Sequence, residues 1–111
     1  MTKKRPVPTE STVLVLETLG TQVRLARVKS GLTAAQLAKR AGVGPRTVTA
    51  VERGSPSVTM GNAVEIALAA GVSLYGAEQP EQLRGLATAY RDMAALLPKR
   101  IIVPDLGDID V

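Results

Sequence analysis

The chain contains no cysteine, histidine, phenylalanine or tryptophan. Without cysteine it has no disulfide and no thiolate metal site, and its thiol-free composition fits a reducing cytoplasm. Without histidine it lacks the commonest metal ligand and the commonest general base. It also has no phosphate-binding glycine loop of the P-loop kind and no carboxylate pair in a plausible cleft. We therefore expect a protein that is not an enzyme and that uses no metal or cofactor.

Aromatic residues and long apolar runs are also scarce. Tyr75 and Tyr90 are the only aromatic residues, yet hydrophobic residues make up 45% of the 111 positions. The core must therefore be aliphatic, at about 1.5–3 kcal/mol for each large side chain that is fully buried. Met1–Arg5 is basic but has no apolar segment after it, and Val13–Leu16 is too short to cross a membrane. We expect no membrane contact and a cytoplasmic location.

Charge is distributed unevenly along the chain. Residues 24–53 carry seven cations and one anion, a net charge of +6, whereas residues 54–111 carry four cations and seven anions, a net charge of −3. A basic segment beside an acidic one suggests a polyanionic partner for the basic part. This segment is therefore the first candidate for a functional surface.

Helix signals recur throughout, and we predict an all-α fold of five helices, with either a short C-terminal strand or an extended tail. The first helix has the least certain start. Ser11 or Thr12 could cap it, the β-branched run Thr12–Val15 could equally form a strand, and Gly20 should break or kink it. From Thr21 to Lys29 the helical spacing is clear, with these apolar positions: Val23 or Leu25, Val28 and Leu32.

The later helices have clearer ends. Thr33 should cap the second, with Gln36 at the position that completes a capping box. Proline suits the first position of a helix and glycine the position just after its end, so Pro45 and Gly42 mark a start and a stop. The predicted bounds are Ala34–Ala41, Pro45–Arg53, Met60–Ala70 (capped by Thr59 and closed by Gly71) and Pro80–Leu97. The fourth is apolar on most sides and should be central to the core.

The second and third helices together have the features of a helix-turn-helix. Leu37 should face Val48 and Val51, and Ala38 is small where the two helices approach each other. Gly42 supplies the turn, because a left-handed backbone is cheap only for glycine. Two short helices joined in this way form the unit that inserts a helix into the major groove of DNA.

Residues 25–72 resemble the Xre-type, phage repressor-like family of helix-turn-helix proteins. The matching segments are Gly31–Thr33, Gln36–Ala38, Ala41–Val43, Thr47–Val48 and Glu52–Gly54. The resemblance implies a repressor-like fold, double-stranded DNA as the partner, and a buried structural ion pair between Arg27 and Glu52. One position departs from many relatives: Ala34 stands where they place a glutamine that contacts phosphate. That contact should then come from Gln36, Lys39 or backbone amides at the helix N-terminus.

A finer resemblance is to the HipB-like antitoxins. It rests on Glu52–Gly61, Ala69–Val72 and Leu97–Arg100. The resemblance implies a sequence-specific transcriptional repressor that binds and inactivates a HipA-like kinase and represses its own operon as a dimer. The alternative is a stand-alone Xre-type regulator without a toxin partner.

Candidate DNA contacts divide into residues that read bases and residues that position the protein. Arg46 is the strongest base reader, because its guanidinium can bind guanine O6 and N7 together. Thr49 and Ala50 could contact thymine methyl groups, while Gly44 and Pro45 allow close approach. Phosphate contacts, which fix register without reading sequence, are expected from Thr47, Lys39, Arg40 and Arg53.

The C-terminal segment carries an apolar stripe. Its spacing near 3.5 residues suits either the core or a dimer seam, and we expect it to contribute to a homodimer on a roughly palindromic operator. The candidate dimer or partner residues are Leu83, Leu86, Tyr90, Leu97, Ile101, Ile102 and Val103. We divide the chain into a disordered basic arm (1–10), a helix-turn-helix domain (11–75) and a C-terminal helix and tail (76–111).

Overall fold

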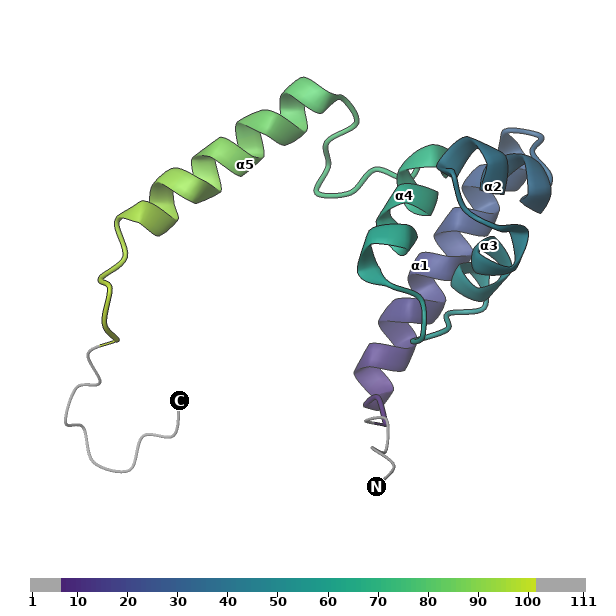
Figure 1. Ribbon diagram of the computed structural model, residues 1–111, viewed down its shortest axis with the longest axis horizontal. Helices are drawn as coiled ribbons and strands as arrows, with labels where there is room; N and C mark the ends of the chain where they lie inside the picture. The colour runs from purple at the N-terminus through teal and green to yellow at the C-terminus, as the bar shows by residue number, and fades with distance from the viewer. Residues whose placement is uncertain (1–6, 102–111) are drawn as a thin grey trace. The chain divides into compact units, whose positions relative to one another are not determined.

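Five helices make up the regular structure of residues 7–101, the part of the chain that the computed structural model describes (Figure 1). They are α1 (Glu10–Lys29), α2 (Ala34–Ala41), α3 (Pro45–Glu52), α4 (Met60–Ala70) and α5 (Pro80–Ala95). These residues contain no strand, and their only β-type pairing is an isolated bridge between Leu74 and Ala77. The predicted all-α, five-helix fold is thus confirmed. The chain divides between Glu78 and Gln79 into two compact units, the first holding α1–α4 and the second α5.

Local capping sets the bounds of α2 and α4 and the start of α3 as predicted, while α3 ends at Glu52, one residue before the predicted end, with Arg53 as its C-cap. Thr33 Oγ1 accepts the Gln36 N–H at 3.1 Å while Gln36 Oε1 accepts the Thr33 N–H at 2.8 Å, so the capping box is complete. Gly42 ends α2 in the left-handed conformation, with φ 72°. Pro45 is the first residue of α3, and Thr59 caps α4 through the Asn62 N–H.

The start of α1 differs from the predictions. Thr9 is the N-cap, and the helix begins at Glu10, the last residue assigned to the basic arm. Thr12–Val15 is helical, which excludes the strand alternative. The threonines of this helix satisfy their hydroxyl groups locally, since Thr18 and Thr21 donate to the carbonyls of Leu14 and Glu17 at 2.7 and 2.9 Å. Residues 1–6 of the predicted arm lie outside the described part.

Gly20 does not break the helix, because α1 continues through it to Lys29. It is buried where α1 crosses the end of α3. A Cβ built on Gly20 would collide with the carbonyl oxygen of Val51 and lie 2.7 Å from that of Glu52. The missing side chain therefore lets the backbones of α1 and α3 come into contact, which explains why a glycine stands inside this helix.

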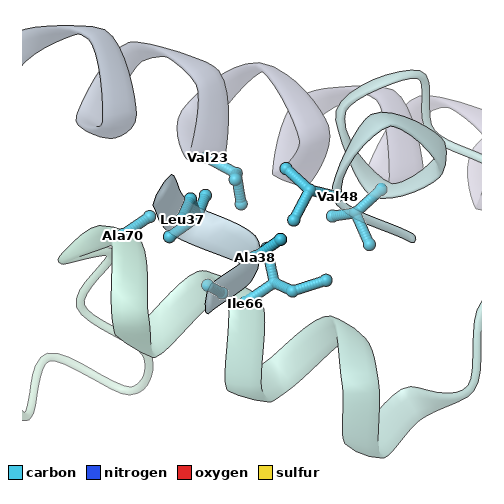
Figure 2. Close-up of a cluster of buried hydrophobic side chains, with 8 residues drawn as sticks. Val23, Leu37, Ala38, Val48, Ile66 and Ala70 are labelled. Atoms are coloured by element: carbon cyan, nitrogen blue, oxygen red, sulfur yellow. The ribbon is translucent and has the colours of Figure 1, made fainter. Parts of the chain in front are cut away.

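The core of the first unit lies where its four helices meet (Figure 2). Its largest fully buried side chains are Val23, Leu37, Val48 and Ile66, one from each helix. The same cluster contains three small buried residues, Ala38, Ala67 and Ala70. Such an all-aliphatic core agrees with the composition.

Three details of the predicted core are corrected. Val23 is the buried member of the Val23/Leu25 alternative, while Leu25 is exposed. Val28 is also exposed, because α1 turns it away from the side that carries Val23 and Gly20. In α4 only Ile66, Ala67 and Ala70 are fully buried, and Met60 and Leu68 lie on its open side. That helix is therefore covered on one side rather than surrounded.

The second unit contains α5, which ends at Ala95, two residues earlier than predicted. Its start is fixed by Pro80 and by a hydrogen bond from the Gln79 N–H to Gln82 Oε1 at 3.0 Å. None of its residues is fully buried. Ile101 belongs to no strand, and Ile102 and Val103, the rest of the predicted strand, lie outside the described residues. Between residues 7 and 101, no helix is long and apolar enough to cross a membrane.

Candidate nucleic-acid interface

The connection between α2 and α3 is fixed from both sides. Gly42 takes the left-handed conformation, and the Val43 N–H then bonds to the Ala38 carbonyl at 3.0 Å. Gly44 follows as the N-cap of α3. On the buried side of the two helices, Leu37 of α2 belongs to the same core cluster as Val48 and Val51 of α3. The turn and the cluster together hold α3 at a set angle to α2, as a helix-turn-helix requires.

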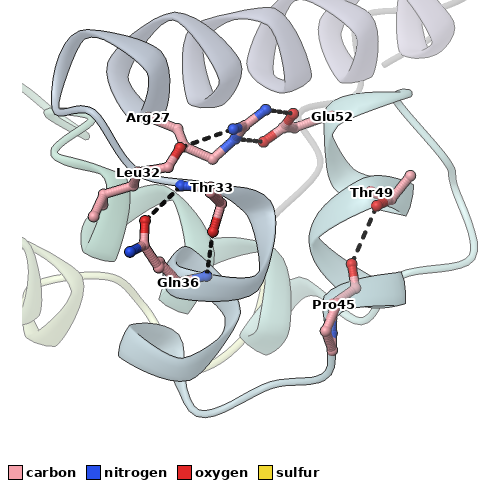
Figure 3. A network of polar contacts seen from close by, with 7 residues as sticks. All are labelled: Arg27, Leu32, Thr33, Gln36, Pro45, Thr49 and Glu52. Carbon is pink, nitrogen blue, oxygen red and sulfur yellow. Dashed lines mark hydrogen bonds and ion pairs between the residues drawn. The ribbon is translucent and has the colours of Figure 1, made fainter.

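The N-terminal end of α3 faces solvent. Gly44, Pro45 and Arg46 are exposed, whereas Thr47, Thr49 and Ala50 are half-buried. Thr49 Oγ1 donates to the Pro45 carbonyl at 3.2 Å (Figure 3). Its hydroxyl hydrogen is thus used within the helix, so its methyl group is left as an apolar contact.

Four exposed cations belong to α2 and α3: three lie on the turns next to the α2–α3 connection, and the fourth lies at the opposite end of α3. Lys39 and Arg40 are exposed on the last turn of α2, Arg46 is exposed on the first turn of α3, and Arg53 is exposed at its C-cap. Within residues 7–101 none of them forms an ion pair. Their charge is therefore available to an external anion.

Gln36 is exposed, but one of its two polar side-chain atoms already takes part in a hydrogen bond within the protein. Its Oε1 is held by the cap of α2, as Figure 3 shows, so only its amide nitrogen can donate to an external group. The structure thus gives this residue a structural role beside the predicted phosphate contact. Ala34, at the position where many relatives have glutamine, is half-buried against the core cluster.

Arg27 and Glu52 lie together between α1 and the end of α3 (Figure 3). Arg27 Nε and Nη2 donate to the two carboxylate oxygens of Glu52 at 2.7 and 2.9 Å, and Nη1 donates to the Leu32 carbonyl at 2.9 Å. Their side chains are only 15% and 11% exposed. The hydrogen bond to Glu52 is the main cause that raises the pKa of Arg27 above its ordinary value.

The pair therefore ties three segments of the helix-turn-helix together: α1, the loop before α2, and the end of α3. Because its polar atoms are turned inward onto each other, it presents little to an external ligand. The Leu32 carbonyl, the third acceptor, was not singled out from the sequence, because a backbone oxygen leaves no mark in the residue pattern. The two close approaches of α1 were also missed: Gly20 on α3, and Glu17 on Gly54, where an added Cβ would lie 3.0 Å from the Glu17 backbone.

The remaining predicted site residues belong to the second unit. Leu83 and Leu86 are half-buried on α5, and Tyr90 is exposed on the same helix. Leu97 and Ile101 are exposed beyond its C-terminus. The structure brings Leu83, Leu86 and Tyr90 onto one helical element and leaves Leu97 outside it.

Residues 23–76 match the family model described as helix-turn-helix. The match begins in α1, spans α2 to α4 and ends just after them. Geometry and comparison therefore agree that this part of the chain is a helix-turn-helix domain of the repressor-like, all-α class, whose members bind DNA. Among curated proteins, none matches the chain.

Proposed function

We propose that the protein is a sequence-specific regulator of transcription, a repressor, that binds double-stranded DNA in the cytoplasm. The observation that carries this proposal is the exposed N-terminal end of α3. It is held by α2 and carries Arg46, while Lys39 and Arg40 lie on the adjoining last turn of α2. Arg53 adds a fourth cation at the other end of α3, and none of the four has an anionic partner among the described residues. In a helix-turn-helix this end of the second helix enters the major groove.

Within the proposed complex, Arg46 reads a guanine and the others position the domain. A guanidinium that is exposed and unpaired is free to bind O6 and N7 of guanine. Thr49 and Ala50 present small apolar groups beside it, suited to a thymine methyl group. Lys39, Arg40, Thr47 and Arg53 contact phosphates, and Gly44 and Pro45 keep the backbone close to the base edges.

The test is to select binding sites from random duplex DNA with the full-length protein. The proposal predicts an enriched motif and binding that weakens steeply with salt, because each phosphate contact releases counterions. Enrichment of no motif, together with affinity that does not change between low and moderate salt, would remove the proposal. Salt-sensitive binding without a motif would leave only non-specific DNA binding.

We also propose that the regulator acts as a homodimer. A dimer would place two α3 helices about 34 Å apart, one turn of DNA, on a roughly palindromic site. The selected motif tests this directly, since a dimer predicts two inverted half-sites and a monomer predicts one.

A finer proposal is that the protein is the antitoxin of a HipA-like kinase and represses the operon of the pair. Its support is the resemblance of Glu52–Gly61, Ala69–Val72 and Leu97–Arg100 to the HipB-like antitoxins. Co-expression with a kinase encoded next to it should yield a stable complex and loss of kinase activity. If no such neighbour exists, or if the two do not co-purify, the chain is a stand-alone regulator, and the DNA-binding proposal is unaffected.

A further inference from the structure

The side of α3 that faces away from the core carries few kinds of side chain. At 3.6 residues per turn, four residues fall within one sector of about 100° opposite the buried Val48 and Val51. They are Arg46, Thr49, Ala50 and the C-cap residue Arg53. We call this sector the α3 outer face. In the proposed complex it lies against the base edges in the major groove.

The α3 outer face has donors but neither a carboxylate nor an amide oxygen. Its two guanidinium groups can only donate hydrogen bonds. The only carboxylate of α3, that of Glu52, is held by Arg27 at 2.7 and 2.9 Å and lies off this face. Adenine and cytosine present amino donors in the major groove, which call for an acceptor on the protein. This face is therefore suited to guanine, whose O6 and N7 are both acceptors.

The hydroxyl group of Thr49 is engaged within its own helix. Its Oγ1 donates to the Pro45 carbonyl at 3.2 Å, as Figure 3 shows, so the hydroxyl is directed back along α3. Ala50, the next residue, has a methyl group and no polar side-chain atom. Together the two residues offer a base edge carbon and hydrogen rather than a hydrogen-bond donor.

These apolar groups lie close to the guanidinium group that is proposed to bind guanine. Thr49 and Ala50 follow Arg46 by three and four residues, a spacing that places Cβ atoms about 5–6 Å apart on a helix surface. Successive base pairs of DNA are about 3.4 Å apart along the axis. The two methyl groups therefore reach a base pair that adjoins the guanine.

Thymine differs from the other bases in the major groove by its C5-methyl group and its O4 acceptor. With the hydroxyl hydrogen of Thr49 already donated, neither Thr49 nor Ala50 can donate to O4, so these residues contact the methyl group alone. In 5-methylcytosine the same methyl group stands at the same ring position, while an amino group replaces O4. A surface that contacts only the methyl group binds both bases alike and disfavours uracil and unmodified cytosine.

From the engaged hydroxyl of Thr49 and its spacing from Arg46, we infer that Thr49 and Ala50 bind the C5-methyl group of a pyrimidine next to the guanine. Thymine and 5-methylcytosine both supply that group. Methylation of a cytosine at this position therefore strengthens binding. The inference rests on the proposed function and deepens it, because it makes DNA binding depend on a chemical modification of the DNA.

The test measures the affinity of the full-length protein for four duplexes that differ at one pyrimidine. The guanine is the base pair at which Arg46→Ala relaxes the preference, and the selected motif should hold a thymine in a base pair that adjoins it. That thymine is replaced by uracil, and its base pair by guanine paired with cytosine or with 5-methylcytosine. Within each pair of duplexes, thymine with uracil and 5-methylcytosine with cytosine, the methylated member should bind about fourfold more tightly, as expected for the burial of one methyl group.

Two variants of Thr49 separate its methyl group from its hydroxyl group. Thr49→Ser removes the methyl group and should bring both affinity ratios below about twofold, whereas Thr49→Val keeps a methyl group and should leave both near fourfold. Thr21→Ser is the matched control, because the Thr21 hydroxyl donates in the same way, to the Glu17 carbonyl at 2.9 Å, but on α1. It should leave both ratios unchanged.

Several results would overturn the inference. Equal affinity for the two members of either pair would show that the methyl group is not bound. Unchanged ratios in Thr49→Ser, or ratios lost in Thr49→Val, would mean that Thr49 does not act through its methyl group. An enriched motif without thymine in either adjoining base pair overturns the inference but leaves the proposed DNA binding in place, whereas the enrichment of no motif removes both.

Discussion

Gly20 shows how one residue sets the distance between two helices. Its hydrogen atom faces the carbonyl oxygens of Val51 and Glu52, and no side chain fits there. Gly20→Ala should destabilise the protein by about 1–3 kcal/mol, the usual effect of overpacking a core, although alanine is the better helix former.

Gly85 in α5 is the control for this substitution. It is also inside a helix, but an added Cβ would meet nothing within 4 Å. Gly85→Ala should therefore leave the stability unchanged or raise it by about 0.5–1 kcal/mol. Chemical denaturation of both variants measures the difference, and an equal response of the two would contradict the close approach at Gly20.

Arg27 and Glu52 make a second prediction about single residues. Glu52→Ala leaves a largely buried guanidinium without its main partner and should cost about 3 kcal/mol of unfolding free energy. A guanidinium is charged at neutral pH in any case, and the hydrogen bond to Glu52 raises the pKa of Arg27 further, so the variant keeps a positive charge that has lost its partner. Thermal unfolding of Glu52→Ala beside Glu65→Ala, an exposed carboxylate on α4, is the measurement.

Glu65→Ala should change the stability by no more than about 0.5 kcal/mol, as is usual for surface sites. A Glu52→Ala protein as stable as the Glu65→Ala protein would show that the pair is dispensable for the fold. Arg27 would then have to be considered again as a ligand-facing cation.

At the scale of single elements, α2 depends on its cap more than the longer helices do. It has only eight residues, and Thr33 and Gln36 satisfy two backbone N–H groups between them. Thr33→Ala should cost about 1 kcal/mol. Thr9→Ala, at the cap of the 20-residue α1, lies far from the core and should cost less. Urea unfolding of both variants tests this order, and the reverse order would contradict it.

The elements that could be predicted from the sequence are those with strong local signals. Thr33, Pro45 and Thr59 mark helix starts through caps and proline geometry, and Gly42 and Gly71 mark ends, so α2, α3 and α4 were located closely. The first half of α1 could not be decided, because a β-branched run suits either helix or strand and tertiary packing makes the choice. Val23 and Leu25 differ by two positions, and only the direction of packing separates them.

For the candidate site, the sequence predicts which residues face outward but not how their polar atoms are used. The exposure of Arg46 follows from the phase of α3, in which Val48 and Val51 are buried. The internal hydrogen bonds of Gln36 and Thr49 do not follow from that phase, because a side chain can turn toward its own backbone or away from it. These bonds change what each residue can offer a ligand.

At the scale of the whole molecule, we assign the two proposed functions, DNA binding and dimer formation, to different units of the chain. The first holds a complete helix-turn-helix around its own aliphatic core. The second contains α5, whose apolar residues form the stripe predicted from the sequence, and this helix ends at Ala95, before Leu97. DNA binding and dimer formation can therefore be tested separately.

The most direct test of the central claim is the affinity of Arg46→Ala for the selected DNA site and for random duplex DNA, with Arg53→Ala as the comparison. We predict that Arg46→Ala loses about 1–3 kcal/mol on the selected site and relaxes the preference at one base pair, with a smaller loss on random DNA. Arg53→Ala should weaken both alike. Unchanged affinity of Arg46→Ala for both DNAs would contradict the claim that α3 reads the major groove.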